Sequence, residues 1–121
     1  ADAEGDHGHA MLAAQAHDIE QGHCGALDTA AARRMALAQV ARDQYMARML
    51  QRYADRGIVL LAGNGHVRAD IGVPQWLDAA TRARSESIGL VEQGDDDDGR
   101  YDLRLVTPRQ PRVDPCAGMR R

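Results

Sequence analysis

The pattern of apolar and polar positions changes at Gly57. Before this glycine the apolar residues recur with a helical period, and after it comes a continuous apolar run, Ile58 to Ala62. A short, unalternating run that is bounded by glycines is typical of a strand buried on both faces of a sheet. The sequence therefore predicts a central strand over residues 58–62.

Two helices are predicted before this strand. Residues 10–21 are good helix formers with apolar positions near helical spacing, and Gly22 would end this helix. Asp28 or Thr29 can then cap a long second helix, which ends before Gly57. One face of the second helix is rich in methionine, a residue that usually packs in a core.

The pattern after the strand predicts one more helix and two more strands. Pro74 suits the first turn of the helix, which would end near Arg84. Residues 87–92 and 101–107 have the composition of strands, and the exposed loop at residues 93–99 favours an antiparallel connection. The expected fold class is α/β: two helices followed by a small sheet, as the C-terminal part of a larger α/β domain.

These elements divide the chain into four parts. The expected parts are a flexible N-terminus (1–9), a helical segment (10–56), a strand-turn-helix part with two further strands (57–117) and a tail (118–121). With 121 residues, the chain forms one domain at most.

Composition and charge limit which classes of binding partner the chain can be expected to have. The net charge of −3 implies neither nucleic acid nor an anionic membrane surface. No apolar stretch reaches the length of about 18 residues that a membrane span needs, so no transmembrane segment is expected in this chain. The sequence also lacks a Cys-x-x-Cys pair, a phosphate loop and a recognisable nucleophilic triad.

The most informative chemistry follows the predicted strand. Gly63, Asn64 and Gly65 break it, because glycine and asparagine tolerate the positive φ of a sharp turn. His66 would then lie just beyond the carboxyl end of a central strand, where ligands bind in open α/β sheets. The alternative is a turn histidine that bonds backbone groups. The residues alone leave both open.

Polar residues on the second helix form another candidate group. Gln39 lies on its methionine-rich stripe, with Arg42 and Asp43 at the edges. A buried amide or carboxylate must be hydrogen-bonded or must face a cavity. These side chains therefore either form a structural network with neighbouring helices or line a ligand pocket.

Several of these pieces, in this order, resemble the ChaN-like family of iron-regulated, haem-binding lipoproteins, which are related to Tiki and erythromycin-esterase-type proteins. The signature is the stretch from Gly63 to Arg68 followed by Asp70, Gly72-Val73-Pro74 and Leu77. The resemblance extends from residue 20 to residue 117 through His23-Cys24-Gly25, Ala38-Gln39, Arg42-Asp43, Met46-Ala47 and Asp114-Pro115-Cys116.

The resemblance implies a non-catalytic haem-binding protein that takes part in haem and iron uptake. It implies a homodimer in which the haem iron takes a tyrosine from one subunit, with a histidine from the other nearby. The haem-binding candidates are His66, Asn64, Arg68, Gln39, Arg42, Asp43, Tyr53 and Tyr45, with His66 and Tyr53 as candidate iron ligands. The implied location is the periplasm or the outer membrane, with a lipid anchor in an N-terminal part outside this sequence.

The two cysteines, Cys24 and Cys116, lie in loop-like contexts. Their spacing alone leaves a bridge and two free thiols equally open. The resemblance to exported lipoproteins favours the disulfide, because such bonds persist in oxidising compartments.

Two other functions remain open at this stage. The Tiki and esterase relatives suggest a fragment of a metal-dependent hydrolase, although the Gly-Glu-x-His-type motif of the family's opening segment is absent from this sequence. A truncated fragment without activity is the other alternative.

Overall fold

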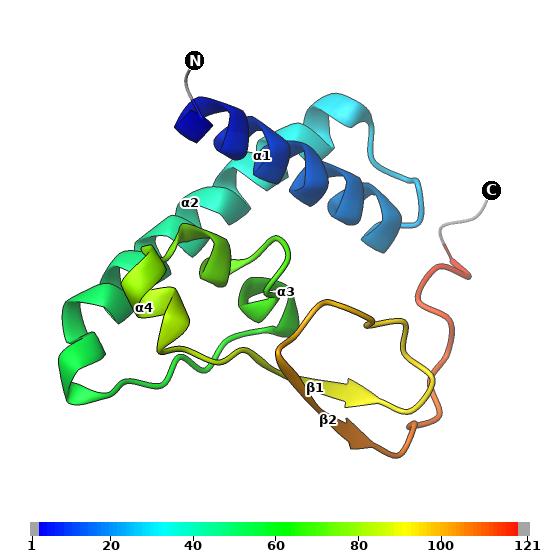
Figure 1. Cartoon of the computed structure of the whole chain (residues 1–121). Coiled ribbons are helices and arrows are strands. Elements are labelled where there is room, and N and C mark those ends of the chain that lie inside the picture. Colours follow the sequence, from blue (N-terminus) through cyan, green and yellow to red (C-terminus); the bar gives the residue numbers. More distant parts are fainter. Residues whose placement is uncertain (1–2, 119–121) are drawn as a thin grey trace. The chain divides into compact units, whose positions relative to one another are not determined.

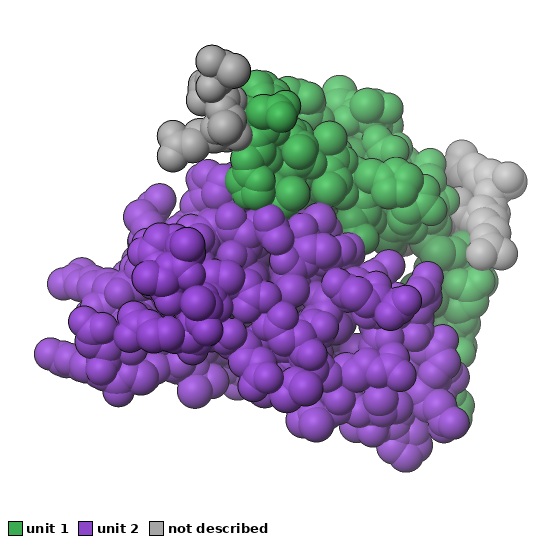
Figure 2. Space-filling view, viewed as in Figure 1, with its two compact units in different colours: residues 1–41, 111–121 green, residues 42–110 purple. Residues whose placement is uncertain are grey.

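The computed structural model describes residues 3–118 (Figure 1). They belong to two compact units: one comprises residues 1–41 and 111–121, and the other residues 42–110 (Figure 2). The boundary falls within the long helix α2 (Thr29–Tyr53).

The first unit contains helix α1 (Ala3–Gly22) and the first half of α2. α1 begins at Ala3, whereas the sequence predicted that this helix would start at residue 10. One reason is a local hydrogen bond, 2.8 Å long, between His9 Nδ1 and the Gly5 carbonyl one turn earlier. Ala1 and Asp2 lie outside the described residues.

The turn between the two helices has a recognisable local chemistry. Cys24 and Gly25 both have left-handed backbone angles, with φ of 61° and 73°. Gly25 N donates to the Glu20 carbonyl at 3.1 Å, which satisfies an orphan carbonyl at the end of α1. Of the two residues predicted to cap α2, Asp28 does so, because its Oδ1 accepts a 2.7 Å bond from Ala31 N.

A disulfide joins this turn to the C-terminal tail. Cys24 and Cys116 are bridged, with 5.6 Å between their Cα atoms and a sequence separation of 92. The bridge that the family resemblance favours is confirmed. It fixes residues from the two ends of the sequence within one unit.

The second unit holds the rest of α2 and a series of short elements. These are the 3-10 helix η1 (Ala54–Arg56), helix α3 (Asn64–Val67), the 3-10 helix η2 (Val73–Trp76), helix α4 (Ala79–Ala83), and strands β1 (Ile88–Glu92) and β2 (Leu103–Thr107). The one helix predicted from Pro74 is therefore two pieces. The break occurs because Asp78 starts α4 afresh, its Oδ1 accepting from Thr81 N at 2.7 Å.

The prediction of a central strand over residues 58–62 is wrong. This segment has no regular secondary structure, and Val59 and Leu61 are 89% and 90% exposed. A strand is stabilised by hydrogen bonds to a neighbouring strand, and within residues 3–118 the sheet consists of β1 and β2 only.

The two strands that do form are parallel, so the antiparallel connection expected at residues 93–99 is also wrong. Ile88 pairs with Leu103 and Leu90 with Leu105. The connection is long enough to bring the chain back beside the start of β1 before β2 begins. Helices followed by a small parallel sheet confirm the α/β class.

None of the helices described in residues 3–118 combines the length and the apolar character that crossing a membrane requires.

Candidate functional site

Residues 63–72 fold into a tight turn around α3, which we call the His66 turn. His66 N donates to the Gly63 carbonyl and Gly72 N to the Arg68 carbonyl, both at 2.9 Å. A Cβ atom added at Gly72 would lie 2.3 Å from the His66 carbonyl oxygen. The backbone can approach this closely only because residue 72 has no side chain.

Asn64 attaches the turn to strand β1. Its side-chain Nδ2 donates to the Leu90 carbonyl at 2.6 Å, and its Oδ1 accepts from Leu90 N at 3.4 Å. The carboxamide thus takes the place that a neighbouring strand's backbone would occupy. Tyr101 adds a third link, because its hydroxyl donates to the Asn64 carbonyl at 3.5 Å.

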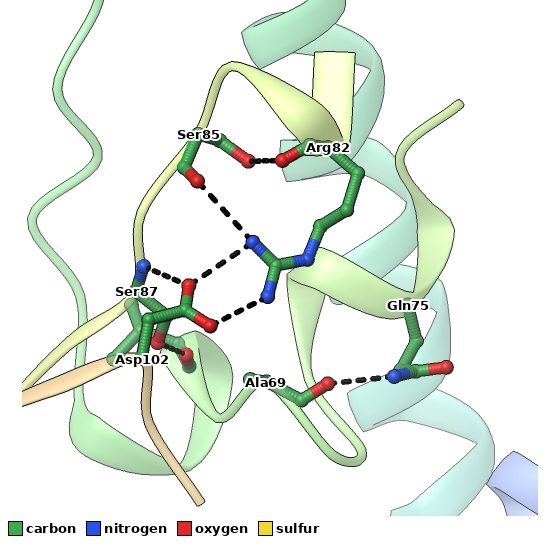
Figure 3. A network of polar contacts seen from close by, with 7 residues as sticks. Ala69, Gln75, Arg82, Ser85, Ser87 and Asp102 are labelled. Carbon is green, nitrogen blue, oxygen red and sulfur yellow. Dashed lines mark hydrogen bonds and ion pairs between the residues drawn. The ribbon is translucent and has the colours of Figure 1, made fainter. Parts of the chain in front are cut away.

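A second set of contacts links the turn to Ser87, Asp102 and Arg82 (Figure 3). Ser87 Oγ donates to the Val67 carbonyl, and Ser87 N donates to Asp102 Oδ2 at 2.7 Å. Asp102 in turn accepts two bonds from the Arg82 guanidinium, at 2.8 and 3.0 Å. These contacts connect the His66 turn, α4 and the starts of both strands.

Arg68 is committed to an ion pair within the turn. Its Nε and Nη2 donate to the two carboxylate oxygens of Asp70 at 2.9 and 2.7 Å, and the arginine is only 9% exposed. Burial would raise the pKa of Asp70, but the hydrogen bonds and the charge of Arg68 outweigh it and lower that pKa. Arg68 therefore shapes the turn.

His66 is paired with a buried carboxylate of helix α2. Its Nδ1 lies 2.6 Å from Asp43 Oδ1. The Asp43 side chain has no exposed surface, whereas 23% of the His66 side chain is exposed. Burial raises the pKa of Asp43, against the opposing hydrogen bond and charge of His66.

This arrangement is suited to metal chemistry. A metal-ligating histidine usually donates its other ring N–H to a carboxylate or carbonyl, which fixes the ring's orientation. The imidazole is also an established ligand of haem iron. Within residues 3–118, no three His, Cys, Asp or Glu side chains gather as a metal-binding group.

The remaining candidates from the sequence all lie on α2. Gln39 belongs to the first unit and is half-buried. Arg42 is exposed on α2 next to Asp43. Tyr45 is 59% exposed, with the Arg48 guanidinium 5.9 Å from its ring centre, and Tyr53 has a similar contact with its neighbour Arg52 at 5.5 Å.

Sequence reasoning missed three features of the site. It named Asp43 and His66 separately, but nothing in the sequence indicates that residues 23 positions apart are bonded. Tyr101 lies 37 positions from Asn64, and no motif links them. Gly72 belongs to the family signature, so its steric role had a signal that sequence reasoning did not use.

A separate cleft of about 430 Å³ lies over residues 95–104 of the second unit. Its acidic side chains are partly neutralised, since Arg104 contacts Asp97 Oδ1 at 2.5 Å and Arg109 contacts Asp95 Oδ1 at 2.9 Å. His66 is not among its lining residues, so this cleft is not the candidate site.

The family described as haem-binding uptake, Tiki superfamily, ChaN matches residues 3–77. The match covers more than half of the chain, including both long helices, Asp43 and the whole His66 turn. No curated protein and no solved structure is similar enough to this chain to count as a match. The chain therefore belongs to the ChaN family of haem-binding uptake proteins within the Tiki superfamily.

Proposed function

We propose that this protein binds haem at the His66 turn and takes part in haem uptake without catalysing a reaction. The observation that carries the proposal is the 2.6 Å contact between His66 Nδ1 and Asp43 Oδ1 inside the region that matches the family. It gives the protein a partly exposed imidazole whose orientation is fixed by a buried carboxylate.

The residues around the turn fit a haem. Because the porphyrin supplies most of the iron's ligands, one or two protein side chains suffice, and His66 is a suitable nitrogen donor. Val59 and Leu61, which lead into the turn, expose apolar surface of the kind a porphyrin ring needs. Bound haem would supply a redox-active iron centre.

The other candidate residues have supporting roles in this proposal. Asn64 fixes the turn to β1, and Arg68 shapes it through Asp70. Arg42 is exposed on α2, and we propose it as a cation for a haem propionate. Tyr45 and Tyr53 are the tyrosines on α2 that a second copy of the chain would bring to a shared haem.

We place the protein's action at the cell envelope, in the periplasm or attached to the outer membrane, and we propose a homodimer as its haem-binding form. Size-exclusion chromatography before and after hemin addition tests whether the haem-binding form is a homodimer. A shift to twice the monomer mass on loading is expected, and a mass that stays monomeric at haem saturation contradicts the dimer.

The test of the function is a hemin titration followed by absorbance. The wild-type chain should give a saturating shift of the Soret band, and His66→Ala should bind hemin at least about tenfold more weakly, a loss of about 1.4 kcal/mol. His17→Ala, at an exposed position of α1, is the matched control and should bind like the wild type. Equal affinities for all three proteins would remove His66 from the site.

A further inference from the structure

Asp43 differs from the other polar candidates because its side chain has no exposed surface. Its side chain is completely buried in the middle of α2, one helical turn before the buried Ala47. A carboxylate with no exposed surface cannot touch a ligand outside the protein. Asp43 does contact a partly exposed group, because its Oδ1 lies 2.6 Å from His66 Nδ1, so an influence of Asp43 on a ligand can pass through this imidazole.

The chemistry of this contact determines which nitrogen of His66 holds the proton. A carboxylate that is ionised has only acceptor atoms, so with Asp43 ionised the hydrogen of the short bond belongs to the imidazole Nδ1. In a neutral imidazole the other nitrogen, Nε2, then carries the lone pair. A lone pair on Nε2 is what an iron ligand requires.

We infer that Asp43 is a positioning residue, which holds His66 in the Nδ1–H tautomer and in one ring orientation so that Nε2 serves as the donor to haem iron. The inference rests on the proposed function for its last step only. The tautomer and the ring orientation are properties of the haem-free chain.

The asymmetry of burial supports this assignment over a purely structural ion pair. A pair that serves only the core would be expected to have both partners buried, because each charge then needs the other. Here the carboxylate is 0% exposed and the imidazole 23% exposed. The pair therefore joins a fully buried carboxylate to a partly exposed imidazole.

The experiment has two readouts, three test variants and one control variant. Nitrogen-15 NMR of histidine-labelled, haem-free protein reports the protonation of each ring nitrogen of His66 in the wild type and in Asp43→Asn. Hemin titrations are then run on Asp43→Asn, His66→Ala and the double variant. Asp55→Asn is the matched control, because it makes the same change at a carboxylate that is 96% exposed.

The expected result is an Nδ1–H tautomer in the wild type and a mixture or the reversed tautomer in Asp43→Asn. Hemin affinity should fall by about tenfold to a hundredfold in Asp43→Asn, the usual range for a residue that orients a metal ligand. The double variant should bind no more weakly than His66→Ala alone, because both changes act on one contact. Asp55→Asn should behave like the wild type in both readouts.

Three results would overturn the inference. An Nε2–H tautomer in the wild type excludes it without any variant, even if Asp43→Asn does not fold. An unchanged tautomer in Asp43→Asn, or a further loss of affinity in the double variant, shows that Asp43 does not act through His66. If the tautomer changes as expected but His66→Ala binds hemin normally, the proposed function fails while the positioning of the ring stands.

Discussion

At the scale of single residues, the His66 turn depends on one position without a side chain. A Cβ atom at Gly72 would lie 2.3 Å from the His66 carbonyl oxygen and 2.8 Å from the Arg68 carbonyl oxygen. Both neighbours are backbone atoms, so the clash cannot be relieved by rotating a side chain. The backbone of His66, the candidate iron ligand, would therefore have to move.

Gly72→Ala should therefore destabilise the protein by about 1–3 kcal/mol, the usual cost of overpacking, and should weaken hemin binding as well. Urea unfolding measures the first effect and absorbance titration the second. Gly65→Ala is the matched control, because a Cβ atom there meets nothing within 4 Å. A Gly72→Ala protein as stable as Gly65→Ala would contradict the described geometry of the turn.

At the scale of elements, one carboxylate holds together the parts that support the turn. Asp102, just before β2, accepts from the Arg82 guanidinium of α4 and from Ser87 N, just before β1 (Figure 3). The hydrogen bonds from Arg82, with help from Ser87 N and against the effect of burial, lower the pKa of Asp102 from its ordinary 3.8. The ionised carboxylate is therefore a stabilising group.

Asp102→Asn should lower the free energy of unfolding by about 1.5–3 kcal/mol at neutral pH, the range for hydrogen bonds to a charged group. A lowered pKa in the folded state means that this contribution is present above pH 3.8 and is lost as the pH falls through the folded pKa. Urea unfolding at a series of pH values should show the two proteins converging in acid.

The control for Asp102→Asn is Asp55→Asn, which breaks a 3.5 Å contact between the exposed Asp55 and Arg84. Such a surface pair contributes only about 0–1 kcal/mol. A difference between wild type and Asp102→Asn that stays constant down to low pH would contradict the role given to the ionised Asp102.

At the scale of the whole molecule, the chain is held together by more than local contacts. The first unit combines residues from both ends of the sequence, and the Cys24–Cys116 disulfide joins them across 92 positions. In the chain-entropy model, closing a loop of this length raises the free energy of the unfolded state by about 4–5 kcal/mol, because fewer chain conformations remain. For a chain with few large side chains in its core, this is a substantial contribution.

Reducing the disulfide should lower stability by up to this amount and should loosen the tail. Limited trypsin digestion at Arg109 and Arg112, monitored by mass spectrometry, measures the second effect. Cleavage there should be faster with a dithiol reductant or in the paired variant Cys24→Ser/Cys116→Ser. Equal cleavage rates in the oxidised and reduced proteins would show that the bridge does not hold the tail.

Sequence reasoning succeeded where local chemistry decides the structure. The cap at Asp28, the helix end at Gly22 and the residue types of the family signature were all readable from the sequence. It failed for residues 58–62, because an apolar run becomes a strand only if a partner strand pairs with it. The parallel pairing of β1 and β2 is a non-local property for the same reason.

The candidate site shows the same limit. His66 was identified because its turn was placed at the carboxyl end of a central strand over residues 58–62; that strand does not form, so the residue was found by an argument that the structure does not support. Its bond to Asp43 and the support of the turn by Tyr101 join positions that are far apart, and one sequence contains no record of such contacts. The structure therefore adds the second half of the site, the groups that hold the imidazole.

The measurement that tests the central claim most directly is a two-dimensional amide ¹H–¹⁵N NMR spectrum recorded during hemin addition. Paramagnetic ferric iron broadens the signals of the nearest amides, so the spectrum locates the bound haem. The account predicts that signals of residues 63–72 broaden first and most strongly, and that His66→Ala removes this pattern. Broadening centred on another part of the chain, such as the acidic cleft at residues 95–104, would contradict it.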